Sequence, residues 1–231
     1  MLFPSPSAAF LLPGLLHQFG NLLLTVQGQA MHVAGSDLAA MQSAVTDVVG
    51  RGSASLQIMR ALMHERSGVV GDARPLLSTI CELGRVAARE HNINLRALAD
   101  DGATGPVDVE HFVNACTEML QGFLDAMPVA ASDASSPVVR VTLAVAEEHA
   151  LVTVRFDATE GALPFPMPFE ELKSQLAASL AQADASVTSE IQSPAPEASA
   201  GSSPHGSQAL RLRIPLQLND LGPRSWFGPQ A

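Results

Sequence analysis

The residue types around one histidine could support phosphoryl transfer. His17 and Asn21 are four positions apart, so on a helix they are neighbours on one face, and Thr25 and Gly28 continue that side. An imidazole is largely neutral near pH 7, and its free ring nitrogen can take a phosphoryl group from an acyl phosphate and return it. That step depends mainly on positioning and charge neutralisation. The alternative is a surface or interface histidine with no chemical role.

Two apolar stripes of helical spacing indicate the elements that would position His17. The first covers residues 8–33 and the second residues 38–63, with a short break at 34–37 between them. Two long helices joined by a tight turn form an antiparallel hairpin, which we expect at 7–66. A single hairpin cannot bury its own apolar stripe. Pairing two hairpins in a four-helix bundle would bury it, so the sequence predicts a homodimer.

The rest of the chain alternates helical and strand-like segments after a glycine-containing linker at 67–74. Helices are expected at 75–90, at 109–127 with Asp108 as its cap, and at 169–184, and strands at 93–99, 138–145, 150–156, 186–191 and 210–216. This order predicts an α/β sandwich at 72–218, with the helices on one face of the sheet. Residues 192–208 are expected to form a flexible loop and 219–231 a tail. The predicted fold class is α+β.

Composition narrows the class of protein. The chain has 231 residues, with 13 basic and 23 acidic side chains and a net charge of −10, and its first basic residue is Arg51. These features argue against a nucleic-acid groove and against a secretory leader. Pro13 and polar residues interrupt the apolar N-terminal segment, so we expect no membrane span and a cytoplasmic protein. Cys81 and Cys116 have no pairing pattern, which favours reduced core thiols.

Residues 16–28 resemble the dimerisation and histidine-phosphotransfer helix of two-component sensor histidine kinases. In that family an acidic residue follows the phospho-accepting histidine directly, and an asparagine stands four positions after it. The resemblance implies that His17 is the phosphoacceptor and that Asn21 orients water when a partner is dephosphorylated. Gln18 replaces the acidic residue that is usually assigned as general base, and an amide cannot accept a proton at neutral pH.

Residues 72–216 resemble the ATP-binding domain of the same kinases, but most of its motif residues are replaced. Asp125 and the three residues after it match the end of the Asn-rich motif, while Gly122 stands at the position of the magnesium-binding asparagine. Asp157 matches the adenine-binding aspartate, whereas Thr159 replaces the first glycine of that motif. The glycines that cradle the phosphates have no counterpart here. We therefore regard Asp125 and Asp157 as vestigial and expect no tightly bound cofactor and no resident metal.

Three functions fit these features, in decreasing order of expectation. The first is a standalone histidine phosphotransferase that relays phosphoryl groups between receiver domains of response regulators. The receiver would supply Mg²⁺, a hybrid histidine kinase is a further candidate partner, and Leu16, Gly20 and Leu24 would set docking specificity. The second is a non-enzymatic pseudokinase scaffold that binds and regulates a response regulator or a kinase. The third is a divergent active histidine kinase, which would have to bind ATP without the usual Asn and Gly residues.

Overall fold

The computed structural model describes most of the chain in separate stretches. These are residues 6–31, 38–63, 68–99, 104–127, 137–157, 169–180, 185–192 and 207–217. The expected break at 34–37, the tail at 219–231 and nearly all of the expected loop at 192–208 lie outside the described residues. Those expectations therefore remain predictions.

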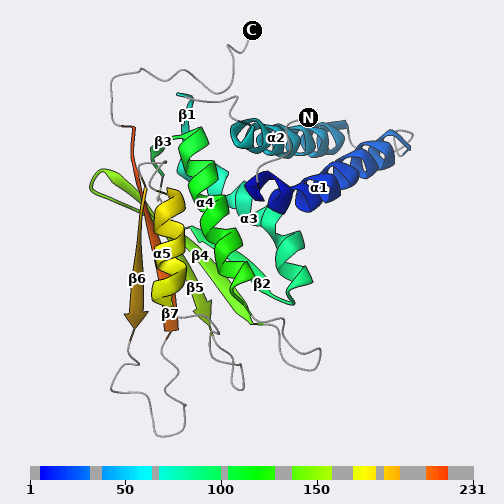
Figure 1. The fold of residues 1–231 in the computed structure, drawn as a ribbon. Coiled ribbons are helices and arrows are strands. Elements are labelled where there is room, and N and C mark those ends of the chain that lie inside the picture. Colours follow the sequence, from blue (N-terminus) through cyan, green and yellow to red (C-terminus); the bar gives the residue numbers. More distant parts are fainter. Residues whose placement is uncertain are drawn as a thin grey trace, which may run out of the picture.

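The N-terminal part is a hairpin of two helices, α1 (Pro6–Met31) and α2 (Leu38–Leu62), which pack along each other (Figure 1). Both helices were expected from the apolar stripes. Pro13 lies inside α1 rather than in its first turn. Leu11 of α1 and Ile58 of α2 are completely buried, because the start of α1 and the end of α2 pack against the rest of the molecule.

The rest of the molecule is built on a five-stranded sheet in the order β2-β4-β5-β7-β6. Its strands are β2 (Asn94–Ala99), β4 (Val138–Ala146), β5 (His149–Asp157), β6 (Ser186–Gln192) and β7 (Ser207–Pro215). Strands β2 and β4 are parallel, and the other neighbouring pairs are antiparallel. Helices α3 (Ala73–Glu90), α4 (Val109–Asp125) and α5 (Phe169–Leu180) cover one face of the sheet (Figure 1). The predicted α+β class is confirmed.

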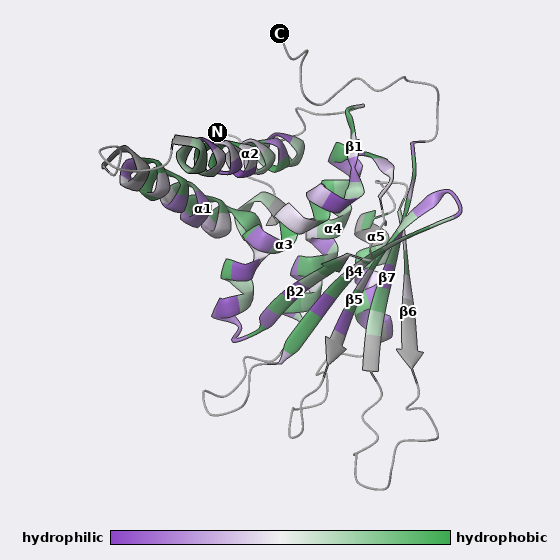
Figure 2. Ribbon diagram, turned by 180° about the vertical axis from the view of Figure 1, so that it is seen from behind, coloured by the Kyte–Doolittle hydropathy of each residue, from purple (hydrophilic) through white to green (hydrophobic). Residues whose placement is uncertain are grey.

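The two faces of the sheet differ in chemistry. The residues that face the helices are apolar and buried, and they include Val141, Leu143, Val152, Val154, Leu210 and Leu212. On the other face, the strand register aligns Arg96, Arg140 and Arg155 in one row across β2, β4 and β5. Arg211 and Arg213 on β7 belong to the same face. In the view from behind, no described helix covers this arginine-bearing face (Figure 2).

A small two-stranded sheet was not expected from the sequence. Strand β1 (Val70–Asp72) pairs antiparallel with β3 (Pro106–Asp108). The expectation of a linker at 67–74 is therefore wrong for residues 70–72, and also for 73 and 74, where α3 has already begun. A strand of three residues is too short to show an alternating pattern, and its pairing partner is distant in the sequence.

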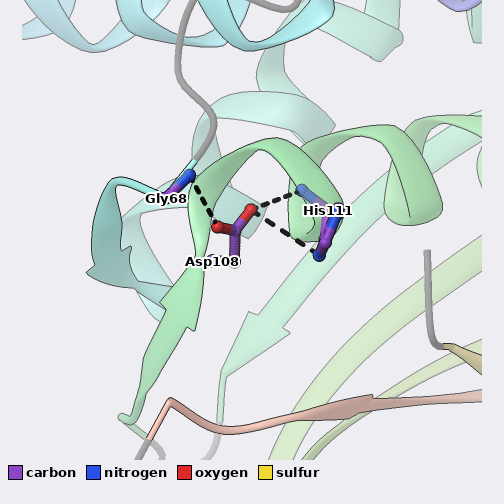
Figure 3. Close-up of polar contacts among 3 residues, drawn as sticks. All are labelled: Gly68, Asp108 and His111. Atoms are coloured by element: carbon purple, nitrogen blue, oxygen red, sulfur yellow. Dashed lines mark hydrogen bonds and ion pairs between the residues drawn. The ribbon is translucent and has the colours of Figure 1, made fainter. Parts of the chain in front are cut away.

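Asp108 connects this small sheet to helix α4, as its predicted role as helix cap requires. Its carboxylate accepts hydrogen bonds from the backbone N–H of His111 at 2.9 Å and from that of Gly68 at 3.2 Å (Figure 3). The bond from His111 satisfies an otherwise unpaired N–H of the first helical turn. A single carboxylate thus ties the segment that follows the hairpin to the start of α4.

Among the described residues, one stretch, Ala8–Gly28 in α1, is long and apolar enough to cross a membrane by length and composition. Several apolar side chains in this stretch, such as Leu11 and Leu15, are buried against the α/β part. The core helix of a globular protein passes the same test, so this property alone assigns no location to the protein.

Candidate phosphoacceptor site

His17 lies near the middle of α1, and its side chain is exposed to solvent. Nδ2 of Asn21 lies 3.1 Å from His17 Nε2. An amide nitrogen donates, so this contact is a hydrogen bond in the ring tautomer whose Nε2 is the acceptor. The structure thus brings together the two residues that the sequence placed on one helix face. In that tautomer the nucleophilic lone pair of His17 is on Nε2, where Asn21 contacts it.

Gln18 contacts the second helix of the hairpin. Its Oε1 accepts a hydrogen bond of 2.6 Å from Oγ of Ser55 in α2, and Ser55 is almost completely buried. The side chain at the position of the family's general base therefore contributes to packing between α1 and α2. Sequence reasoning missed Ser55, since no motif marks a serine that bonds across a helix pair.

The surface around His17 is open. Leu16 and Leu24 are 64% and 66% exposed. A β-carbon placed on Gly20 would have no atom within 4 Å of it. All three residues that the sequence proposed for partner docking are therefore accessible on the helix that carries His17. Small and apolar side chains at such a surface allow another protein to approach closely.

An apolar stripe runs along α1 beside the His17 surface. Leu12, Leu16 and Leu23 are all exposed, and at 3.6 residues per turn they lie on one side of the helix. Large apolar side chains are also exposed on α2, at Val49 and Leu56. The hairpin therefore has apolar surface that no described part of the same chain covers.

A close contact between two helices fixes the position of α1. A β-carbon at Gly14 would overlap the backbone oxygen of Leu83 in α3, so only glycine fits where these helices cross. Nearby, Phe10 of α1 would lie 3.6 Å from a β-carbon at Gly84. Gly14 is three residues before His17. The backbone contact of Gly14 with α3 therefore positions His17 relative to the sheet. The signal for this helix contact in the sequence was a glycine inside an apolar helix.

Helix α5 packs against Gly122, the position that the resemblance assigns to a metal-binding asparagine. A β-carbon at Gly122 would lie 3.1 Å from Cδ2 of Leu176 and 3.6 Å from Cδ1 of Leu172, and both leucines are buried. The hollow that remains has a volume of about 240 Å³ and is lined by Gly122, Asp125, Ala126, Leu172, Gln175 and Leu176. Small-molecule sites usually measure about 300–1,000 Å³. Asp125, which is exposed, is the one carboxylate in this lining.

Other residues of the nucleotide motifs lie outside the described part of the structure. Asp157 ends β5, but its side chain is not described, and neither are Thr159 and the rest of 158–168. Within the described residues, no three His, Cys, Asp or Glu side chains gather closely enough to hold a metal ion. The vestigial role of Asp157 thus remains a prediction.

The two cysteines are buried free thiols in the neighbouring helices α3 and α4. Burial raises the pKa of Cys81 to about 12, against the opposing charge of Arg85, while Glu82 adds to the rise. Burial also raises the pKa of Cys116 well above its usual range, and Cys81 adds to that. Both thiols are therefore neutral core groups, as the sequence predicted, rather than nucleophiles.

Comparisons with known proteins give only remote similarities. No family model and no curated protein sequence matches the chain. The catalytic domain of histidine kinase ThkA is 13% identical over 64% of this chain and 95% of its own, with a TM-score of 0.43. A bacterial phosphotransferase is 14% identical over 92% of this chain and 98% of its own, with a TM-score of 0.39. The blue-light activated histidine kinase of Erythrobacter litoralis is 17% identical over 89% of this chain and 60% of its own, with a TM-score of 0.43.

Proposed function

We propose that the protein is a dimeric histidine phosphotransferase of two-component signalling. It relays phosphoryl groups between receiver domains through His17 and does not bind ATP. The observation that carries this proposal is the exposed imidazole of His17, whose Nε2 faces Asn21 on an open helix surface. A phosphoryl acceptor needs a ring nitrogen that a partner can reach, and this ring lies on an open surface, where the only group that contacts Nε2 in the described structure is the side chain of Asn21.

The relay consists of two displacements at phosphorus. Nε2 of His17 attacks the phosphorus of an aspartyl phosphate on one receiver, so an N–P bond forms while the P–O bond to the aspartate breaks and its carboxylate leaves. A carboxylate of a second receiver then attacks the phosphohistidine, and the N–P bond breaks. Asn21 must first release Nε2, because it contacts that atom in the free protein. Mg²⁺ held by the receiver neutralises charge on the transferred group.

The packing of α5 supports a relay that operates without ATP. Leu172 and Leu176 fill the space next to Gly122, where the related kinases place a metal-binding asparagine. Leucine side chains offer no ligand to Mg²⁺ and no donor to a phosphate. The phosphoryl group would therefore come from another protein rather than from a nucleotide bound here.

The exposed apolar stripe on α1 supports the homodimer. Leu12, Leu16 and Leu23 lie beside His17 and are uncovered in the single chain. Packing this stripe and the exposed part of α2 against a second hairpin would remove it from water in a four-helix bundle. Leu16 lies at the border between the proposed dimer contact and the proposed receiver contact.

A non-enzymatic scaffold is the second candidate, and one observation favours it. The lone pair of His17 is occupied by Asn21, and Gln18 is bonded to Ser55, so the free protein shows neither a free nucleophile nor a base beside it. A protein of this kind would bind a receiver or a kinase without taking up its phosphoryl group.

The test is transfer from a phosphorylated receiver. Purified receiver domains from the same genome, radiolabelled on the aspartate, are mixed with the wild-type protein, with His17→Ala and with His111→Ala. His111 is an exposed histidine on α4, so its replacement is a matched control. We expect acid-labile label on the wild type and on His111→Ala, and none on His17→Ala.

Each other outcome decides between the alternatives. Binding of a receiver without label on any variant would support the scaffold. Label obtained from ATP alone, and lost in Asp157→Ala, would establish a divergent kinase. A monomer in light scattering at micromolar concentration would contradict the four-helix dimer.

A further inference from the structure

A second hollow lies at the β2 edge of the sheet, between α3 and β2. Its volume is about 480 Å³, within the range of about 300–1,000 Å³ that is usual for binding sites. It is lined by Arg85, Arg89, Asn92, Ile93, Asn94, Leu95 and Arg96. No carboxylate is among these lining residues, although the protein as a whole carries a net charge of −10. We call this hollow the arginine groove.

One wall of the arginine groove is the free edge of a strand. β2 pairs only with β4 among the described strands, and it stands at the end of the sheet order. The backbone N–H of Asn94 donates to the oxygen of Pro137, on the β4 side. Since the direction alternates along a strand, Leu95 and Ala97 point their backbone N–H and C=O groups away from the sheet. This edge therefore has the hydrogen-bonding groups that an added strand requires.

Three exposed arginines line the groove. Arg85 and Arg89 come from α3 and Arg96 from β2. A negatively charged partner would complement these charges.

We propose that the arginine groove binds an extended, carboxylate-rich segment of a partner protein, which adds as a strand to the free edge of β2. Side chains on one face of an extended strand are about 6.6 Å apart. Arg85 and Arg89 are separated by one helical turn, a rise of about 6 Å along α3. Alternate carboxylates of the added strand can therefore meet successive guanidinium groups. This role goes beyond phosphotransfer and does not involve His17.

The chemistry of the groove favours a polypeptide over other polyanions. Of the 13 basic residues of the chain, 12 are arginine, whose planar fork binds a carboxylate through two parallel hydrogen bonds. No aromatic side chain lines the groove for stacking on nucleic-acid bases. Backbone groups at a strand edge recognise another peptide backbone, which a nucleic acid or a lipid headgroup does not have.

The experiment measures binding of a defined peptide to the full chain. The probe is a fluorescent ten-residue peptide of alternating glutamate and valine, followed by anisotropy at low salt. Replacing Arg85, Arg89 and Arg96 together by glutamine should weaken binding about tenfold, since three exposed ion pairs are lost at once. The matched control replaces Arg51, Arg60 and Arg74 by glutamine, which changes the net charge equally and should weaken binding less than about twofold.

A second peptide tests strand addition separately from charge. It has the same sequence, with every second backbone nitrogen methylated, so it keeps its charge but loses donors for the β2 edge. We expect at least about tenfold weaker binding. Equal binding of the two peptides, or equal losses in the two triple variants, would overturn the proposal. So would tighter binding of a single-stranded oligonucleotide or of phosphatidylglycerol vesicles with the same dependence on the three groove arginines.

Discussion

Two helical glycines, Gly20 beside His17 on α1 and Gly122 on α4, have opposite surroundings. Space around Gly20 is open, while Gly122 meets the buried side chains of Leu172 and Leu176. On α1 a missing side chain leaves room for another molecule, whereas on α4 it leaves room for the protein's own helix α5. The comparison teaches that the same small residue has opposite consequences in two helices. At Gly20 the helix presents a surface, and at Gly122 it packs against buried side chains.

The largest effect should come from Gly14, which supports the His17 surface without belonging to it. Gly14→Ala places a methyl group onto the backbone of Leu83 and should lower the free energy of unfolding by about 3 kcal/mol. Gly20→Ala adds the same methyl group in open space within the same helix. It should raise the free energy of unfolding by about 0.5–1 kcal/mol. Urea unfolding of both variants measures the difference. Equal effects would mean that α1 and α3 do not cross at Gly14.

Truncating a leucine to alanine should affect stability differently beside Gly122 and on the α1 surface. Leu176→Ala removes a buried side chain and should cost about 2–3 kcal/mol of stability, while Leu24→Ala removes an exposed one and should cost less than about 0.5 kcal/mol. Phosphotransfer should respond in the opposite order, with Leu24→Ala slowing it at a fixed receiver concentration. If Leu176→Ala allowed ATP to raise the melting temperature, the leucines alone would have excluded the nucleotide.

A smaller effect on stability is expected at Asp108, which connects the segment after the helical hairpin to the start of α4. Asp108→Ala removes the acceptor for the N–H groups of His111 and Gly68 and should cost about 1–2 kcal/mol. Asp108→Asn keeps an acceptor oxygen and should recover most of that loss. Thermal unfolding of both variants checks this expectation. If Asp108→Asn lost as much stability as Asp108→Ala, the negative charge of Asp108 rather than its role as a hydrogen-bond acceptor would be responsible.

The cysteines should contribute the smallest effect near neutral pH. Below pH 9 Cys81 is a neutral thiol in the folded and the unfolded chain, so it gives no pH dependence there. Above the ordinary thiol pKa of 9.0 the unfolded chain loses this proton while the folded one keeps it, so stability falls as the pH rises toward about 12. At pH 8 we expect neither thiol to react with a thiol reagent until the protein unfolds. Rapid reaction of the native protein would contradict the burial.

The sequence predicted those features that depend on local spacing. The apolar period predicted α1 and α2, and a spacing of four residues predicted that His17 and Asn21 would meet. Alternation predicted β2, two β-rich runs predicted β4 and β5, and Asp108 was recognised as a cap. Each of these signals lies within a few neighbouring residues, where one element determines the geometry.

Features that depend on contacts between distant segments could not be predicted in this way. Ser55 bonds Gln18 because α2 packs along α1, a contact between segments that are 37 residues apart. The sequence placed a glycine at position 122, but it did not indicate that Leu172 and Leu176 would pack against it. The pairing of β1 with β3 joins segments of three residues each, which are too short to carry a pattern.

The crossing of α1 and α3 at Gly14 holds the helix that carries His17 against the α/β part through a backbone contact. In the relay proposed above, a receiver that docks at His17 would meet two parts of the protein that already touch. Such a contact lowers the conformational entropy that docking has to remove.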